Sequence, residues 1–402
     1  MTPGTGRVRR RMGRAGRCGA VVVGVLAALP AAPAQAAPTW TVVPSPNLST
    51  ARNELSGADG ATASEVWAVG TEIEQPAVGP VTTWRSLLLR WNGAAWSIAD
   101  HPRPSGNTAL HDVDATAAGS AWAVGVTSRG ASSATLIERW DGTRWRLVAS
   151  PNPDPGGSNT LQSVDQQAPN SAWAVGSYSN PTRTKALALT ARWDGSQWRA
   201  VPNPATTQYQ NVLQAVDGSA PNDVWAVGYT LSTYIATPTA LLMHWDGQRW
   251  RTVSVPSPQH TTLHGVLAVS RTDVWAVGQS LTPGAGGWNA AILHWDGSRW
   301  TRVPVPVPNA GVLYSDLRDV VALSAGRVYA VGSATTNTGA YVTLVLRWNG
   351  TAWTVNPTPS PPNQPVLRGA AAIGPSTVWA VGHRWDPTVG SSRTLTIRTT
   401  AG

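Results

Sequence analysis

The sequence predicts an all-β fold made of seven four-stranded antiparallel sheets, and three observations support this prediction. A WAVG motif begins at residues 67, 122, 173, 225, 275 and 379, with a YAVG variant at 329. A second motif, of the type RWDGTRW, begins at residues 90, 139, 192, 244, 294 and 347. The seventh repeat, at the C-terminal end, lacks one strand, and a matching strand stands at the N-terminal end. Repetition of this kind is typical of arrays of one supersecondary unit.

Each repeat predicts four strands, which we call a, b, c and d. A leucine stands twelve residues before every WAVG or YAVG, at positions 55, 110, 161, 213, 263, 317 and 367. This leucine segment predicts strand a, VWAVG predicts strand b, segments such as TLIERW predict strand c, and WRLV predicts strand d. Alternating apolar residues, β-branched residues and Gly or Pro punctuation favour strands over helices. Asp-Gly or Asn-Gly supplies the turn between c and d, because glycine tolerates positive φ.

The chain ends complement each other. The seventh repeat starts at Leu367 and reaches residues 394–398, but it has no strand d before the chain ends at Gly402. The segment WTVVPSPN at 40–47 resembles the strand d segment WTVNPTPSP, and Trp40 precedes Leu55 by 15 residues, within the 13 to 17 that separate the other repeats. We therefore expect strand 40–43 to complete the last sheet. The result would be a closed seven-bladed β-propeller, which protects its sheet edges, whereas a linear solenoid gives no reason for complementary ends.

With these motifs the chain resembles the secreted bacterial β-propellers built from WAVG and WDGxxW repeats, and more distantly the kelch and Asp-box propellers. The resemblance covers residues 38–402 and implies the propeller fold. The repeats lack the recurring Gly-Gly doublet of kelch repeats, and their Asp stands directly beside Gly, where the Asp-box places one residue between them. We expect residues 37–402 to form one propeller domain with blades that start near 55, 110, 161, 213, 263, 317 and 367.

Residues 1–36 predict a secretory signal peptide. RVRRRMGRAGR is a basic segment, CGAVVVGVLAAL is a short apolar segment, and Ala34-Gln35-Ala36 fits an A-x-A cleavage signal. The apolar run contains Pro30 and Pro33 and falls short of the roughly 20 residues of a membrane-spanning helix. We therefore expect cleavage after Ala36 and a secreted, extracellular protein that does not insert into a membrane.

Removal of the leader changes the charge and the cysteine content. The formal charge falls from +9 to +3 because six arginines leave with residues 1–36. So small a charge gives no argument for nucleic-acid binding. Cys18, the single cysteine, also leaves, which excludes disulfides, thiolate catalysis and cysteine-ligated metals from the mature chain. We expect a monomer that needs no cofactor.

Most tryptophans have a structural interpretation. Nineteen of the 22 recur at equivalent places in strands b, c and d, so we expect them to pack between blades. The other three are Trp84, Trp288 and Trp385, which the pattern places between strands b and c, at the end of the ring where loop lengths vary. Variable loops on a constant scaffold are where binding usually occurs. These three could stack on a ligand, or Trp84 and Trp288 could simply start strand c.

A polar ring is predicted at the channel. The residues that follow the seven strand-a leucines are Ser56, His111, Gln162, Gln214, His264, Arg318 and Arg368. Strand a is expected to be innermost and to begin at the variable end, so these side chains would surround what we call the channel mouth. Two imidazoles, two guanidinium groups and two amides could bind an anionic or hydroxyl-rich ligand. The alternative is a polar ring that only solvates the channel.

Two sets of residues offer potential metal ligands. Asp59, Asp114, Asp165 and Asp217 share the fourth position after the leucine and could bind a cation through oxygen ligands. They lack the compact spacing of a dedicated loop, so capping or turn bonding is the other interpretation. His244 and His294 replace the Arg of the RW pair, which favours a packed position over a metal site. We predict no metal site.

The function predicted from these features is binding. The sequence contains no HExxH, GxSxG, Walker or Rossmann motif. We expect a secreted, non-catalytic propeller that binds a glycan or a protein partner through its variable loop face and channel mouth. The alternative is a secreted carbohydrate-active enzyme, a polysaccharide lyase or glycoside hydrolase, whose groups come from several blades at the channel mouth. A scaffold without a small ligand is the third option.

Overall fold

The computed structural model describes residues 38–74, 82–117, 119–179, 182, 184–205, 208–256, 259–281, 287–306 and 312–400. Residues 37–402 cluster as one compact unit. The predicted signal peptide lies outside the described residues. Within those ranges, no helix has the length and apolar character needed to cross a membrane.

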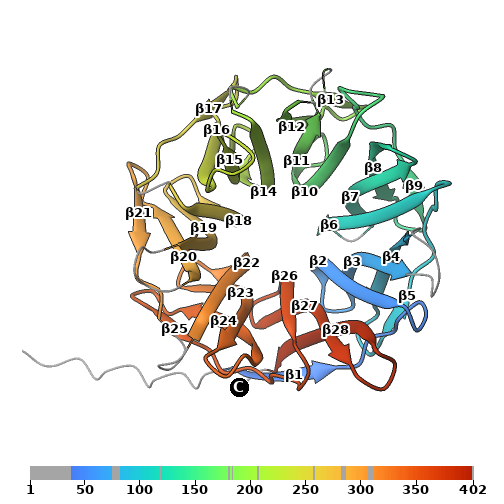
Figure 1. Cartoon of the computed structure of the whole chain (residues 1–402), viewed down its shortest axis with the longest axis vertical. Helices are drawn as coiled ribbons and strands as arrows, with labels where there is room; N and C mark the ends of the chain where they lie inside the picture. The colour runs from blue at the N-terminus through green and yellow to red at the C-terminus, as the bar shows by residue number, and fades with distance from the viewer. Residues whose placement is uncertain are drawn as a thin grey trace, which may run out of the picture. The chain divides into compact units, whose positions relative to one another are not determined.

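The described strands form seven blades arranged in a ring, which Figure 1 shows along the channel. Blade 1 contains β2 (Arg52–Thr62), β3 (Glu65–Glu74), β4 (Thr83–Trp91) and β5 (Trp96–Ile98); blade 2 contains β6 (Asn107–Ala117), β7 (Ser120–Arg129), β8 (Ser132–Trp140) and β9 (Trp145–Leu147). Blade 3 contains β10 (Asn159–Ala168), β11 (Ser171–Ser179), β12 (Ala186–Trp193) and β13 (Trp198–Ala200); blade 4 contains β14 (Gln210–Ala220), β15 (Asp223–Leu231), β16 (Thr239–Trp245) and β17 (Trp250–Thr252).

The remaining blades follow the same order. Blade 5 contains β18 (Thr261–Ser270), β19 (Asp273–Leu281), β20 (Trp288–Trp295) and β21 (Trp300–Val303); blade 6 contains β22 (Val312–Ser324), β23 (Arg327–Thr336), β24 (Tyr341–Trp348) and β25 (Trp353–Val355). Blade 7 contains β26 (Val366–Ile373), β27 (Thr377–Asp386), β28 (Ser391–Thr400) and β1 (Thr39–Val43). The first strand of each repeat borders the channel in Figure 1. A single parallel pair, Ala186 with Gln210, links blades 3 and 4.

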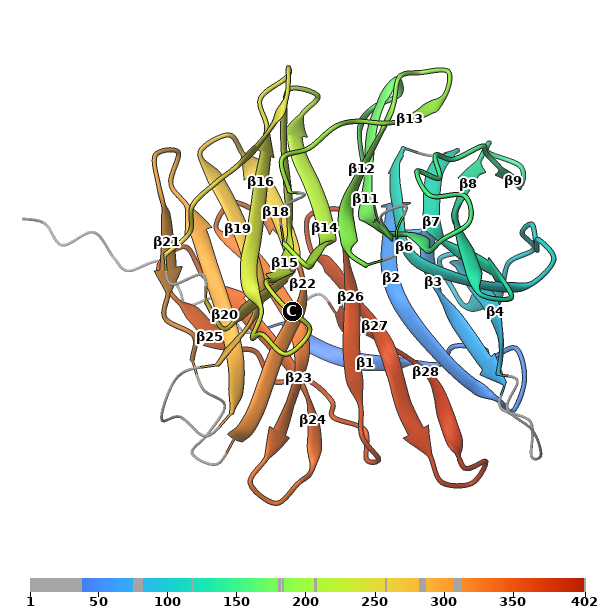
Figure 2. The ribbon, with the colours of Figure 1, turned by 45° about the horizontal axis from the view of Figure 1, so that its top comes forward.

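The N-terminal strand closes the ring, which confirms the prediction. β1 pairs antiparallel with β28, with Trp40 opposite Thr399 and Val42 opposite Ile397. Figure 2 shows β1 along β28 at the edge of the last blade. The indole Nε1 of Trp40 also donates a hydrogen bond of 2.8 Å to Asn356 Oδ1 on blade 6. The first described strand therefore belongs to the last sheet.

Tryptophan clusters hold neighbouring blades together, as predicted. Trp67 of blade 1 lies with its ring centroid 4.9 Å from that of Trp140 and 5.1 Å from that of Trp145, both on blade 2. The same arrangement joins blades 2 to 3, 3 to 4, 4 to 5, 5 to 6 and 7 to 1. The interface between blades 6 and 7 differs, because Tyr329 of blade 6 contacts a single tryptophan, Trp40 of blade 7, with the ring centroids 6.3 Å apart. Each buried indole contributes up to about 5 kcal/mol.

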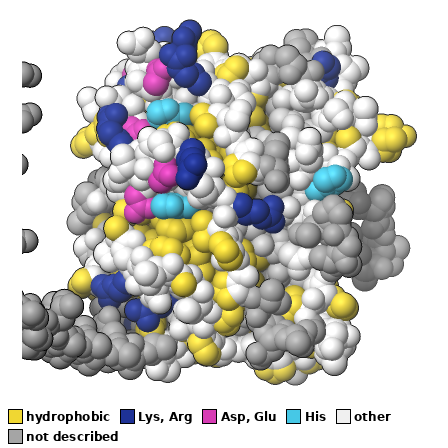
Figure 3. Space-filling model, turned by 90° about the vertical axis from the view of Figure 1, so that its left-hand side faces the viewer, with side chains coloured by type: hydrophobic (Ala, Val, Ile, Leu, Met, Phe, Trp, Pro, Cys, Tyr) yellow, Lys and Arg dark blue, Asp and Glu magenta, His cyan; other side chains and the backbone are white. Residues whose placement is uncertain are grey.

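A cation or an imidazole covers most of these clusters. Arg90 lies over Trp67, with its guanidinium carbon 5.3 Å from the ring centroid. In blades 4 and 5 a histidine takes this place: His244 stacks on Trp225 at 4.2 Å, and its Nε2 lies 2.7 Å from Asp223 Oδ1. His294 and Asp273 repeat this pair. In Figure 3, His side chains lie beside acidic and basic ones near one edge of the ring. The histidines are packing residues, as expected.

The Asp-Gly turns have the predicted geometry. Gly142 has a φ of 91°, a conformation that favours glycine. Asp141 Oδ1 accepts hydrogen bonds from the backbone N–H groups of Thr143 and Arg144, both at 3.0 Å. The equivalent Asx residues of the other five hairpins make the same two contacts. The side chain therefore fixes the turn that joins the two outer strands.

Candidate ligand-binding site at the channel mouth

A bulge in every inner strand shapes the channel mouth. In β2 the pairing with β3 jumps from Leu55–Gly70 to Gly57–Val69, so Ser56 has no partner across the sheet. The same jump follows the leucine in the other six inner strands. The glycine of WAVG is required opposite the bulge, because a Cβ at Gly70 would lie 1.9 Å from the carbonyl oxygen of Glu54. A bulge re-aims side chains, so two consecutive residues can face the channel.

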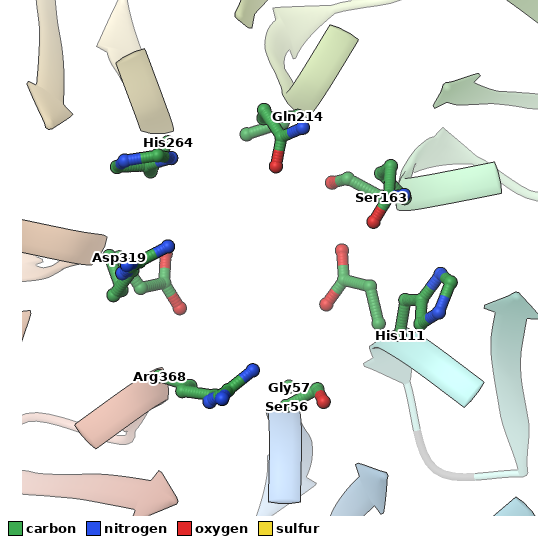
Figure 4. Close-up of a pocket in the computed structure, with 12 residues that line it drawn as sticks. Ser56, Gly57, His111, Ser163, Gln214, His264, Asp319 and Arg368 are labelled. Carbon is green, nitrogen blue, oxygen red and sulfur yellow. The ribbon is translucent and has the colours of Figure 1, made fainter. Parts of the chain in front are cut away.

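The structure brings the seven residues that follow the leucines together around one cavity of about 290 Å³. Its lining contains Ser56, His111, Gln162, Gln214, His264, Arg318 and Arg368, together with Gly57, Asp112, Ser163, Ala215 and Asp319 from the next position. Figure 4 shows the labelled side chains around the opening, with Asp319 and Arg368 reaching toward its middle. We use the name channel mouth for the site formed by these twelve residues. A role of these residues in ligand binding stays a prediction.

Sequence reasoning missed the second position of the bulge. Simple alternation assigns Asp112, Ser163 and Asp319 to the side of the strand opposite their predicted neighbours. The bulge instead places them in the channel, where each accepts a backbone N–H of the next blade. Asp112 Oδ2 accepts from Val164 at 3.1 Å, Ser163 Oγ from Val216 at 3.2 Å, and Asp319 Oδ2 from Ala370 at 2.8 Å. These side chains link neighbouring blades as well as lining the cavity.

The two carboxyl groups of the channel mouth titrate near neutral pH. Burial raises the pKa of Asp112 to about 6, and hydrogen bonds from Ser163 and from backbone N–H groups offset only part of this effect. Burial also raises the pKa of Asp319 to about 7, with a further rise from the charge of Asp112. Both groups therefore change charge within about one pH unit of these values.

The imidazoles of the channel mouth are neutral at pH 7. Burial lowers the pKa of His111, whose Nδ1 lies 2.8 Å from the carbonyl oxygen of Leu161. That contact requires a proton on Nδ1, which leaves Nε2 as an acceptor. Burial and the charge of Arg318 lower the pKa of His264 to about 3. Its Nε2 is buried and has no hydrogen-bond partner among the described residues.

The guanidinium groups are each held by one acid. Arg318 Nε donates to Asp316 Oδ2, and Arg368 Nη2 lies 3.3 Å from Glu54 Oε2. The Asp316 and Glu54 side chains are only 2% and 7% exposed. Burial lowers the pKa of Arg368. The charge of Glu54 raises this pKa in part, and the charge of Arg318 lowers it further. The acids orient the arginines without using all of their donors.

A second cavity, which the sequence did not predict, lies beside the channel mouth. This side groove has a volume of about 500 Å³ and is lined by Tyr314, Asp316, Arg318, Ser333, Thr335, Tyr341, Val366, Arg368 and His383. It is built from blades 6 and 7 and shares Arg318 and Arg368 with the channel mouth. Apart from these two arginines, its residues come from single positions of two repeats, so no recurring sequence signal marks them.

The three tryptophans outside the repeat do not line either cavity among the described residues. Trp84 and Trp288 belong to strand c, within β4 and at the start of β20. Trp385 belongs to strand b, because β27 continues to Asp386, so its expected place in a loop is wrong. Trp84 and Trp385 are 39% and 40% exposed. Stacking on a ligand by any of the three stays a prediction.

The four aspartates with the shared spacing line another cavity of about 250 Å³ in the channel. They link blades: Asp59 Oδ2 accepts the backbone N–H of Ala115 at 2.8 Å, and Asp114 Oδ2 accepts that of Gln166 at 2.9 Å. Asp165 and Asp217 make the equivalent bonds to Gly218 and Ala268. Burial raises the pKa of all four. No group of three or more His, Cys, Asp or Glu within the described ranges could hold a metal ion.

Comparison with known proteins shows the fold alone. The sequence matches no protein-family profile and no curated protein. Among solved structures, a protein of unknown function from Dyadobacter fermentans has a TM-score of 0.52 and 11% identity, covering 91% of this chain and 99% of its own. A polysaccharide lyase, an ulvan lyase bound to -[GlcA(1-4)Rha3S]-, has a TM-score of 0.52 and 9% identity, covering 86% and 94%. The six-bladed, fucose-recognising Aleuria aurantia lectin scores 0.41 at 14% identity, covering 70% and 88%.

Proposed function

We propose that this protein is an exported, monomeric β-propeller of the WAVG-repeat type that binds an extracellular glycan at its channel mouth without transforming it. The observation that carries the proposal is the convergence of guanidinium, imidazole, amide and hydroxyl groups on one cavity of about 290 Å³. This volume lies near the lower end of small-molecule sites, about 300–1,000 Å³, and suits one sugar unit.

Hydrogen-bonding capacity supports a sugar as the ligand. Hydroxyl groups both donate and accept, and the channel mouth offers both kinds of partner. His264 presents a buried nitrogen without a partner among the described residues. The ulvan lyase of similar fold was solved with a glycan fragment, which supports the idea that a propeller of this size can hold one. A protein partner on the variable loop face is the other form of the binding hypothesis, but a concave polar cavity favours a glycan.

Retention on immobilised polysaccharides tests this function. The mature chain, residues 37–402, should be retained by at least one polysaccharide of a panel and should release no new chain ends. His111→Ala and His264→Ala should weaken retention tenfold or more, because each removes a hydrogen-bonding group from the cavity. Arg144→Ala, at an exposed Asp-Gly turn, is the matched control and should bind normally. Failure of every polysaccharide to retain the protein would favour a scaffold.

One observation favours the catalytic alternative, a polysaccharide lyase or glycoside hydrolase. His264, whose Nε2 has no hydrogen-bond partner among the described residues, lies in the same cavity as Arg318 and Arg368. An arginine could neutralise a uronate carboxylate while a base removes the adjacent ring proton; the C–O bond to the next sugar then breaks as a ring double bond forms, and the departing oxygen takes a proton from water. The parent protein would then release unsaturated chain ends from a polysaccharide, and His264→Ala would not. That result would replace the binding proposal with the catalytic alternative.

A further inference from the structure

We propose that the channel mouth and the side groove form one continuous site for an acidic glycan, whose carboxylate or sulfate group lies between Arg318 and Arg368. This inference rests on the proposed glycan-binding function and adds the class of sugar and the path of its chain. Of the residues that line the side groove, the sequence analysis singled out only Arg318 and Arg368.

The two cavities meet at the arginines. Arg318 and Arg368 line both the channel mouth, about 290 Å³, and the side groove, about 500 Å³. They stand at the bulge position of the inner strands of neighbouring blades, β22 and β26. A glycan that places one unit in the channel mouth can therefore continue outward along the side groove. The arginines then face the junction of two sugar units.

The two arginines of the junction, each paired with one buried acid, keep N–H donors that a bound anion can use. Arg318 and Arg368 are close enough for the charge of one to lower the pKa of the other. Asp316 and Glu54 each hold one edge of a guanidinium, and each guanidinium has five N–H donors, so donors remain for a ligand. An anion between them would relieve their repulsion and form charge-assisted, bidentate hydrogen bonds. A neutral sugar would provide neither.

Nearby histidines do not supply this positive charge. Burial lowers the pKa of His383, which lines the side groove, to about 4, and Glu54 raises it only in part. Its Nε2 lies 3.7 Å from Glu54 Oε1. His264, on the other side of Arg318, is also neutral at pH 7. The preference for an acidic ligand therefore depends on the two arginines.

Tyrosines form the outer wall of the side groove. Tyr341, at the start of β24, is 44% exposed and presents its ring to solvent. Tyr314 is partly buried and donates a hydrogen bond of 2.6 Å from its hydroxyl to Gln279 Oε1. An aromatic face beside a polar junction can pack against the apolar face of a second sugar ring. The side groove thus suits an oligosaccharide better than a single sugar.

Two matched pairs of probes test this inference by titration calorimetry. Oligogalacturonate is compared with its carboxyl-reduced form, and dextran sulfate with dextran, at about 0.15 M salt to screen exposed charges. At least one acidic member should bind ten or more times tighter than its neutral partner. The pair that shows the difference identifies the acid as carboxylate or sulfate.

Variants of the mature chain assign the effect to the junction. Arg318→Gln and Arg368→Gln should each lose tenfold or more in affinity for the acidic probe, and Arg368→Lys should be intermediate because it keeps the charge but not the bidentate geometry. Tyr341→Ala should weaken binding of an oligosaccharide but not of free galacturonic acid. Arg144→Gln is the control, and melting temperatures show that each variant is folded.

The outcomes separate the two proposals. Equal binding of acidic and neutral partners, lost in His264→Ala, would overturn the acidic site and leave the glycan-binding function in place. If Arg144→Gln weakens binding of the acidic probe as much as Arg318→Gln does, the probe binds by general charge attraction. This result would also overturn the acidic site. Binding of no probe, and of no polysaccharide in the panel, would overturn both proposals.

Discussion

Buried carboxyl groups connect the structure of the channel to its proposed function at the scale of single residues. Asp112 and Asp319 line the cavity and also accept backbone N–H groups of the next blade. Their pKa values of about 6 and about 7 mean that they carry negative charge at pH 8 and lose most of it by pH 5.5. The charge of the channel mouth is therefore a function of pH.

Affinity for an acidic glycan should rise as the pH falls. Protonation of Asp112 and Asp319 removes two negative charges from the cavity that Arg318 and Arg368 also line, while the uronate stays ionised. We expect oligogalacturonate to bind several-fold to about tenfold tighter at pH 5.5 than at pH 8. Calorimetry at the two values measures this difference. The double variant Asp112→Asn with Asp319→Asn should flatten the profile, and an unchanged slope in that variant would contradict the assignment.

Stability should also depend on these buried acids. A carboxyl whose pKa is raised on folding binds a proton more tightly in the native state, so it favours the fold below the unfolded pKa of about 4 and loses this contribution as the pH rises through its folded value. For Asp112, Asp217 and Asp319 that loss falls between about pH 4 and pH 7. We expect the melting temperature to be several degrees lower at pH 8 than at pH 5.

Asp319→Asn provides the matched variant for this stability effect. It cannot ionise and keeps one acceptor oxygen, for the Ala370 N–H, but it loses the oxygen that accepts the Val320 N–H. Its melting temperature relative to that of the parent should therefore be higher at pH 8 than at pH 5. An equal difference from the parent at both pH values would contradict a raised pKa for Asp319.

The inner strand with its bulge is the element on which the site depends. The bulge follows the leucine in every blade, and the WAVG glycine faces it where no Cβ fits. This arrangement explains why the leucine and the motif keep a constant spacing of twelve residues while the loops vary. The same element both packs against strand b and presents side chains to the channel.

Substitution of a WAVG glycine should be far more costly than that of an exposed turn glycine. A Cβ at Gly70 would lie 1.9 Å from the Glu54 carbonyl oxygen, so Gly70→Ala must separate β2 from β3 and should lower the free energy of unfolding by about 3 kcal/mol or more. Gly326→Ala meets nothing within 4 Å and should change it by less than about 0.5 kcal/mol. Chemical denaturation compares the two, and equal effects would contradict the role assigned to the bulge.

The sequence predicted the strands and the first ring of the channel mouth because both recur at fixed spacing. It did not predict Asp112, Ser163 or Asp319 as channel residues, because alternation fails at a bulge. Trp385 was misplaced because β27 runs beyond the VWAVG motif to Asp386. The side groove escaped prediction since Tyr314 and His383 come from different blades and have no counterpart pattern in the other repeats. Contacts between repeats need coordinates, whereas contacts within a repeat can be deduced from spacing.

At the scale of the whole molecule, closure of the ring is what brings blades 6, 7 and 1 to one site. β1 completes blade 7, whose inner strand carries Arg368, and Glu54 on blade 1 holds that arginine. The Trp379 cluster with Trp91 and Trp96 seals blade 7 against blade 1. Loss of closure would therefore release both an edge strand and the partner of a site residue.

Removal of residues 38–47 tests the closed ring most directly. The truncated chain, beginning at residue 48, loses β1, its pairing with β28 and the contact of Trp40 with Tyr329. Compared with the chain of residues 37–402 by calorimetric melting, it should unfold at a sharply lower temperature, because a whole strand and a buried indole are lost. A truncated chain that melts at the same temperature as its parent would contradict the closure on which the channel mouth depends.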